Sequence, residues 1–160
     1  MRDDQLRALE EIYGVTTTSF IHYLMANAEV QVASDFDRKV RSFFVDWHRA
    51  SELNRTAFLD LLSEHGYTPS TFGFPLNYSE YHYLNASYLL KPVIRLMQQN
   101  LHHIKSRAEK LGDWESARKL VDAVVGRETP FLEKAKELEK EAPHEAPARA
   151  KIRGTSASRW

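Results

Sequence analysis

Hydrophobic positions recur every three, four or seven residues over four long stretches of the chain, which is the pattern of helices with one apolar face. Polar and turn-forming residues separate the stretches. The pattern predicts four helices, over residues 3–31, 34–65, 78–110 and 113–141. Each is about 30 residues or about 45 Å long. Packing four such helices into a bundle is the simplest way to bury their apolar faces.

Short signals indicate where the helices begin and end. Ser34, followed three residues later by Asp37, is typical of a helix start, and Gly66 suits the end of the same helix. Asp113 is expected to cap the fourth helix, in which Gly126 and Pro130 predict a kink or a break at Thr129. In the third helix Pro92 predicts a kink.

Residues 67–77 contain two prolines and a glycine and therefore predict an irregular connection between the second and third helices. The expected fold is an all-α, antiparallel four-helix bundle with one long crossover at this place. A haem-oxygenase-like bundle would also suit the spacing of the helix pairs, but the simple bundle is favoured. We expect the bundle to occupy residues 1–141 and a flexible basic tail to occupy residues 142–160.

Composition excludes several classes of protein. The chain has 22 basic and 22 acidic residues and no cysteine, which argues against a nucleic-acid binder, a disulfide framework and a thiolate metal site. No apolar run is long enough to cross a membrane or to act as a signal peptide, so a cytoplasmic location is expected. Neither a phosphate-binding glycine loop nor a Ser-His-Asp pattern is recognisable.

The second helix that ends at Gly66, the proline-containing crossover and the sequence Glu128-x-x-Phe131-Leu132 together resemble the ferritin-like superfamily, in particular bundles of the rubrerythrin and bacterioferritin type. The likeness covers roughly residues 5–140. It implies a bundle centre in which two helices each supply a Glu and the other two each supply a Glu-x-x-His pair to two metal ions. Iron and manganese ions favour these carboxylate and imidazole ligands.

The residues at the corresponding positions do not form such a ligand set. No acidic residue lies between Glu11 and Glu29 in the first helix, or between Glu80 and Glu109 in the third. One carboxylate remains among the six positions, which are Thr17, Ser51, Asn54, Met97, Glu128 and Phe131. A degenerate, metal-free centre is therefore expected. Glu128 is interpreted either as a vestigial ligand with a raised pKa or as a core residue bonded to Ser51, Asn54 or a threonine.

Histidines give no clear metal motif. The adjacent His102 and His103 point about 100° apart on a helix and cannot easily share one ion. His22 is expected to lie off the inward face, and His82 is expected to be a packed, hydrogen-bonded residue. A histidine-based metal site is accordingly not favoured, and no cofactor is expected.

Two groups of residues are candidates for binding a partner protein. Tyrosines beside the crossover, among them Tyr78 and Tyr81, either form a partner surface or pocket or seal the end of the bundle. Trp160 and the cations of the tail are residue types that anchor interfaces; those cations are Arg149, Lys151, Arg153 and Arg159. Deleting the tail should leave the fold intact and weaken association.

These observations favour a non-enzymatic accessory or scaffold protein that binds protein partners, as a homodimer or within a larger complex. Two alternatives remain open: a di-iron oxidase or metal-binding protein with an atypical site, and a binder of a small apolar ligand. The metal content of the purified protein separates the first interpretation from the di-iron alternative.

Overall fold

The computed structural model describes residues 2–143, and within that range all regular secondary structure is helical apart from one isolated bridge between Gln31 and Asn85. The expected all-α fold is confirmed. The elements, in chain order, are α1 (Asp3–Thr17), α2 (Phe20–Ala26), α3 (Asp35–Glu64), the 3-10 helix η1 (Leu76–Tyr81), α4 (Ala86–Ala108), the 3-10 helix η2 (Glu109–Leu111) and α5 (Glu115–Glu141).

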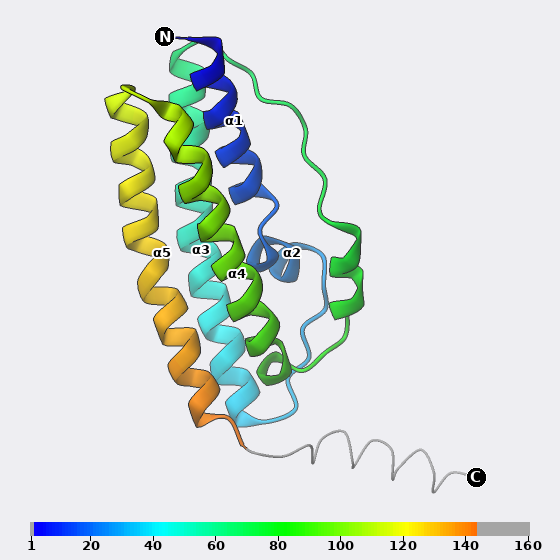
Figure 1. The fold of residues 1–160 in the computed structure, drawn as a ribbon. Coiled ribbons are helices and arrows are strands. Elements are labelled where there is room, and N and C mark those ends of the chain that lie inside the picture. Colours follow the sequence, from blue (N-terminus) through cyan, green and yellow to red (C-terminus); the bar gives the residue numbers. More distant parts are fainter. Residues whose placement is uncertain (1, 144–160) are drawn as a thin grey trace, which may run out of the picture.

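Four of these helices, α1, α3, α4 and α5, lie side by side and form the body of the molecule (Figure 1). Figure 1 shows α1 and α5 running in one direction and α3 and α4 in the other. Because α3 and α4 are parallel, the chain between them must return along the whole bundle. Residues 65–85 make this return, over a longer stretch than the predicted connection at 67–77, and we call residues 67–75 the crossover.

The first predicted helix is wrong in two respects: its second part ends at Ala26 instead of Gln31, and the helix is broken after Thr17. Threonine hydroxyls at this place bond to the backbone of the preceding turn: Thr16 Oγ1 donates to the carbonyl of Ile12, and Thr18 Oγ1 donates to that of Gly14. Such local bonds compete with helix continuation. Ser19 then adopts an extended conformation and caps the new helix α2, which leaves the line of α1 (Figure 1).

The second predicted helix is confirmed at both ends. The hydroxyl of Ser34 accepts a hydrogen bond from the Asp37 N–H at 3.0 Å, so it caps α3 as expected. After Glu64 the chain leaves the helix through Gly66, whose φ of 68° is accessible to glycine at little cost.

The third helix begins at Ala86, eight residues later than the pattern predicts. The preceding segment pairs with the chain that leads into α3: the Tyr83 N–H donates to Glu29, and Gln31 exchanges backbone hydrogen bonds with Leu84 and Ala86. This pairing involves residues far apart in sequence, so local periodicity does not reveal it. Pro92 lies inside α4, as predicted.

The fourth helix has a different start from the one expected and no break. Trp114, not Asp113, occupies the capping position, and the Asp113 carboxylate accepts a hydrogen bond from Gln5 instead. α5 continues through Gly126 and Pro130, so of the two predicted outcomes, a kink or a break at Thr129, the break is wrong. Both Gly126 and Pro130 are exposed, and the carbonyl that proline leaves without a helical partner can therefore bond to water.

Buried side chains form two hydrophobic clusters, one toward each end of the bundle. On α3 the clusters end at Trp47 and resume at Phe58, and on α5 they are interrupted between Val124 and Leu132. The buried residues in these gaps are polar. They are Ser51, Asn54 and Glu128, and we call them the central polar layer.

Candidate functional site

Glu128 is the carboxylate of the central polar layer, and its side chain points inward from α5 with only 5% of the residue exposed. The Trp47 Nε1–H donates to its Oε2 at 2.5 Å, and the Ser51 hydroxyl donates to its Oε1 at 2.8 Å. Burial raises the pKa of Glu128, while these two hydrogen bonds act in the opposite direction. Glu128 is thus a hydrogen-bonded core residue whose acidity is weakened by its surroundings.

Asn54 completes the layer. Its Oδ1 accepts a hydrogen bond from Arg127 Nε at 2.8 Å. The Asn54 amide also lowers the pKa of Glu128, though less than Trp47 and Ser51 do. Its Nδ2 makes no hydrogen bond of ordinary length with any residue that the structure describes. The layer therefore holds one acidic group, one cation at its edge and neutral donors.

The remaining predicted ligand positions supply no further acidic or imidazole group. Met97 is buried in the hydrophobic cluster around α4, and Phe131 stacks on Trp47 with ring centroids 5.7 Å apart. Thr17 is half-buried, and its hydroxyl has no partner within the described part of the chain. A two-metal centre needs several carboxylates to offset two divalent charges. The donor set in the bundle centre does not fit such a centre.

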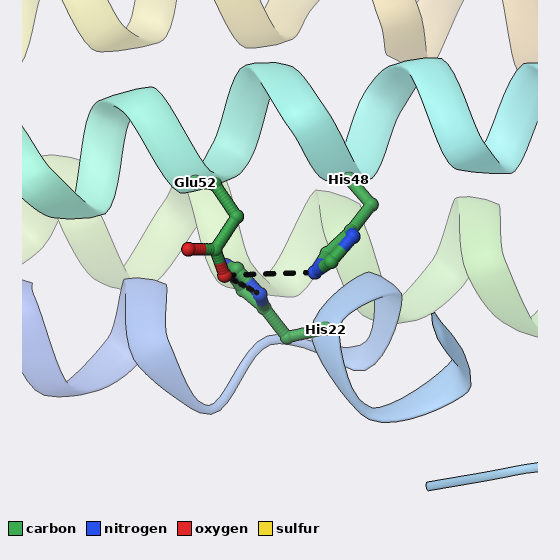
Figure 2. A group of neighbouring side chains, drawn as sticks. All are labelled: His22, His48 and Glu52. Carbon is green, nitrogen blue, oxygen red and sulfur yellow. Dashed lines mark ion pairs between the residues drawn. The ribbon is translucent and has the colours of Figure 1, made fainter. Parts of the chain in front are cut away.

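A second polar group lies away from this layer, where α2 meets α3. We call His22, His48 and Glu52 the His–Glu cluster; their potential ligand atoms all lie within 4.8 Å of one another (Figure 2). Glu52 Oε1 is 3.0 Å from His22 Nδ1 and 3.5 Å from His48 Nε2. The two rings meet edge to face with centroids 4.8 Å apart.

Two local features bring these side chains together. His48 and Glu52 are four residues apart on α3, and residues at this spacing share one face of a helix. His22 comes from the first turn of α2, because the chain changes direction at Thr18 and Ser19. The expectation that His22 lies off the inward face is wrong: it is 4% exposed. That expectation assumed one continuous first helix.

The charges around the cluster are largely balanced. Burial lowers the pKa of His22 to about 4, against the opposing effect of Glu52, so its ring is neutral at pH 7. Arg55 Nη2 contacts the other carboxylate oxygen of Glu52 at 2.9 Å. Although desolvation opposes it, this contact and the nearby His22 keep the pKa of Glu52 below its usual value. The cluster is therefore a neutral imidazole, a half-buried histidine and an ionised carboxylate held by an arginine.

The tyrosines beside the crossover are divided between core and surface. Tyr78 is 8% exposed and packs edge to face against Phe20. Tyr81 also packs against Phe20, and its hydroxyl accepts a hydrogen bond from Arg95 at 2.9 Å. His82 is hydrogen-bonded to Tyr23. Partner binding by Tyr78 and Tyr81 stays a prediction, and their observed contacts are internal.

Other residues near the crossover have exposed apolar side chains. Leu76 is 93% exposed, Tyr83 is 66% exposed and Val32 is 39% exposed. We call these three residues the crossover surface. The predicted partner-binding residues of the tail lie outside the described residues; they are Arg149, Lys151, Arg153, Arg159 and Trp160.

Comparison of the chain with protein-family models, with curated proteins and with solved structures finds no match. Among the described residues, no helix combines the length and apolarity that crossing a membrane requires. The central polar layer, the His–Glu cluster and the crossover surface are the features of the described chain that bear on its function.

Proposed function

We propose that this protein is a non-enzymatic accessory or scaffold protein that binds a partner protein through the crossover surface. The observation that carries the proposal is the exposure of Tyr83: the residue is 66% exposed, and its backbone has a φ of 61°. For a bulky residue this left-handed conformation costs about 1–2 kcal/mol. Such outliers concentrate at functional sites.

Several contacts hold Tyr83 in this position. Its N–H donates to the Glu29 carbonyl at 3.1 Å, and the neighbouring residues pair with Gln31. The same pairing brings Gln31, the neighbour of Val32 in sequence, next to the start of α4. Tyrosine and leucine supply apolar contact area, and tyrosine is among the residue types that dominate interface energetics. A partner with a complementary apolar face would remove this area from water.

We also propose that this protein is related to ferritin-like bundles and has lost their metal centre. Parallel α3 and α4 joined by one long connection support this kinship, because ferritin-like folds have one such connection. The central polar layer supports the loss, since Glu128 is engaged by Trp47 and Ser51. A di-iron oxidase, the main alternative, would need ligands that the layer does not supply.

The third interpretation, a binder of a small apolar ligand, receives less support. Two hollows in the described surface, of about 410 and 540 Å³, are lined mainly by charged and polar side chains. Apolar ligands favour pockets lined by hydrophobic and aromatic residues. Three of the five large hydrophobic side chains that are exposed among the described residues belong to the crossover surface, which favours a macromolecular partner.

Paired substitutions test the interaction. In the double variant Leu76→Ser, Tyr83→Asn the apolar contact area is removed, while asparagine tolerates the left-handed backbone. We expect association, with a co-purified partner or with a second copy, to weaken more than about tenfold, which corresponds to about 1.4 kcal/mol. Native mass spectrometry and sedimentation of the full chain measure this change.

Leu53→Ser is the matched control, because Leu53 is 72% exposed on α3 and lies outside the crossover surface. This control should keep full association, and all variants should keep the wild-type circular dichroism. Equal weakening by Leu53→Ser, or unchanged association in the double variant, would contradict the proposal.

A further inference from the structure

We propose that the His–Glu cluster binds one Zn²⁺ ion, with His22, His48 and Glu52 as its three protein ligands and water in the fourth position. This site is separate from the central polar layer and does not depend on the proposed partner binding. Two imidazoles and one carboxylate form a ligand set that zinc uses where one coordination position stays open.

The spacing of the ligand atoms suits a tetrahedral ion. Zinc binds nitrogen and oxygen ligands at about 2.0–2.2 Å, so two ligands of one tetrahedron lie about 3.4 Å apart. Glu52 Oε1 lies 3.0 Å from His22 Nδ1 and 3.5 Å from His48 Nε2. Glu52 Oε1 is thus at ligand spacing from both histidines, and the two imidazole nitrogens, which lie within 4.8 Å of each other, would close to about 3.4 Å around the ion.

The second observation is the state of the buried His22 side chain. Its Nε2 is buried and has no hydrogen-bond partner among the described residues. Consequently the ring makes its polar contacts through Nδ1, which faces Glu52.

Access and second-shell contacts also favour the site. The side chains of His48 and Glu52 are 26% and 41% exposed, so an ion can enter from solvent and keep a water ligand. Arg55 holds Glu52 Oε2 and leaves Oε1 directed at the two histidines. Such outer contacts orient ligating carboxylates. The arginine charge also repels the ion, so moderate affinity is expected.

Zinc is the expected ion because its filled d shell has no geometric preference of its own. It therefore accepts a tetrahedral arrangement of two nitrogens, one oxygen and a water molecule. Copper would bind such a set at least as tightly by the general order of metal affinities. The test therefore uses Zn²⁺ for affinity and Co²⁺ as a spectroscopic probe of tetrahedral geometry.

The test is calorimetric titration of the full chain with ZnCl₂, after treatment with a chelator. We expect one Zn²⁺ per chain and a rise in unfolding temperature, since an ion that binds the folded state stabilises it. His48→Gln and Glu52→Gln should each weaken binding by more than about 100-fold, because even changes to outer contacts cost about 10–100-fold. Co²⁺ should give the visible absorption of a tetrahedral site.

His102→Gln is the control, since His102 is an exposed histidine on α4 that lies outside the cluster. This variant should bind Zn²⁺ as the wild type does. His48 is half-buried, so His48→Gln is expected to fold, and circular dichroism checks that it does. Absence of stoichiometric binding, or binding that survives both cluster substitutions, would overturn the proposal.

Discussion

At the scale of single residues, the sequence predicted the inward direction of Glu128 and named Ser51 as a candidate partner, but it did not predict the bond from Trp47. A helical period was enough to place this residue on the inward face, and it is buried there. The donor Trp47 was recognisable only as one more apolar position, because no local pattern shows which indole N–H will meet a carboxylate 81 residues away. The predicted direction of His22 was wrong for a similar reason. The direction depends on the break between α1 and α2, which the periodic pattern does not reveal.

Glu128 should make stability depend on pH. Its pKa is raised above the ordinary value of 4.5 because it is buried. The folded state therefore keeps a proton that the unfolded state has already lost, so the free energy of unfolding falls as pH rises from 4.5 through the raised pKa. Glu128→Gln has no such proton and should lack this decrease. Urea denaturation between about pH 4 and pH 8 measures the difference between variant and wild type.

Glutamine can accept from Trp47 with its oxygen and donate to Ser51 with its amide, so the variant should remain folded. Glu137→Gln, an exposed change on α5, is the control and should follow the wild-type pH dependence. A difference between Glu128→Gln and wild type that stays constant with pH would show that Glu128 does not titrate as a buried group.

At the scale of secondary-structure elements, helix ends that are set by hydrogen bonds between neighbouring residues were predictable. Helix ends that are set by contacts between residues far apart in sequence were not. The Ser34 cap and the exit through Gly66 use neighbouring residues, and both are observed. The start of α4 depends on Asp37, whose carboxylate accepts the N–H of Ala33 at 2.9 Å and that of Ser87 at 2.8 Å. This contact joins the first turns of α3 and α4 across 50 residues of sequence.

The crossover is held against α1, and its docking can be tested at Gly14. A Cβ atom at Gly14 would lie 2.5 Å from the ring of Phe72, so Gly14→Ala must displace this ring. Replacing glycine by alanine inside a helix stabilises the helix by about 1 kcal/mol. Losing part of the contact between α1 and the Phe72 ring offsets that gain. We expect little net stabilisation and faster chymotrypsin cleavage within the crossover, measured by limited proteolysis.

Gly126→Ala is the matched control for this substitution. A Cβ atom at Gly126 meets nothing within 4 Å, so the change should stabilise α5 by about 0.5–1 kcal/mol and leave cleavage of the crossover unchanged. If Gly14→Ala stabilises the protein as much and leaves cleavage unchanged, Phe72 does not anchor the crossover.

At the scale of the whole molecule, the bundle and its long connection follow from the sequence, because four apolar faces of similar length leave few ways to be buried. Within the described residues α5 ends at Glu141. The boundary between bundle and tail stays a prediction. The division of the core into two clusters needed three-dimensional contacts, as did the meeting of α2 and α3. Partner binding stays a prediction, because interfaces depend on a second surface that this sequence does not contain.

Iron and manganese content distinguishes the proposed function from the oxidase alternative for the molecule as a whole. We expect far less than one iron or manganese ion per chain in protein purified without chelator, because the centre offers one carboxylate already bonded to Trp47 and Ser51. Elemental analysis measures this content together with zinc. About two iron or manganese ions per chain would contradict the loss of the centre.

The parallel arrangement of α3 and α4 has a consequence for how the protein is made. Synthesis proceeds at about 5–20 residues per second, so α3 is complete several seconds before α4. During that time α3 can pair with α1 and α2, but the face that α4 covers stays open to water. The last two helices are joined by a tight turn and can pair as soon as they emerge. A nascent chain paused within the crossover is therefore the form of this protein with the greatest need of a chaperone.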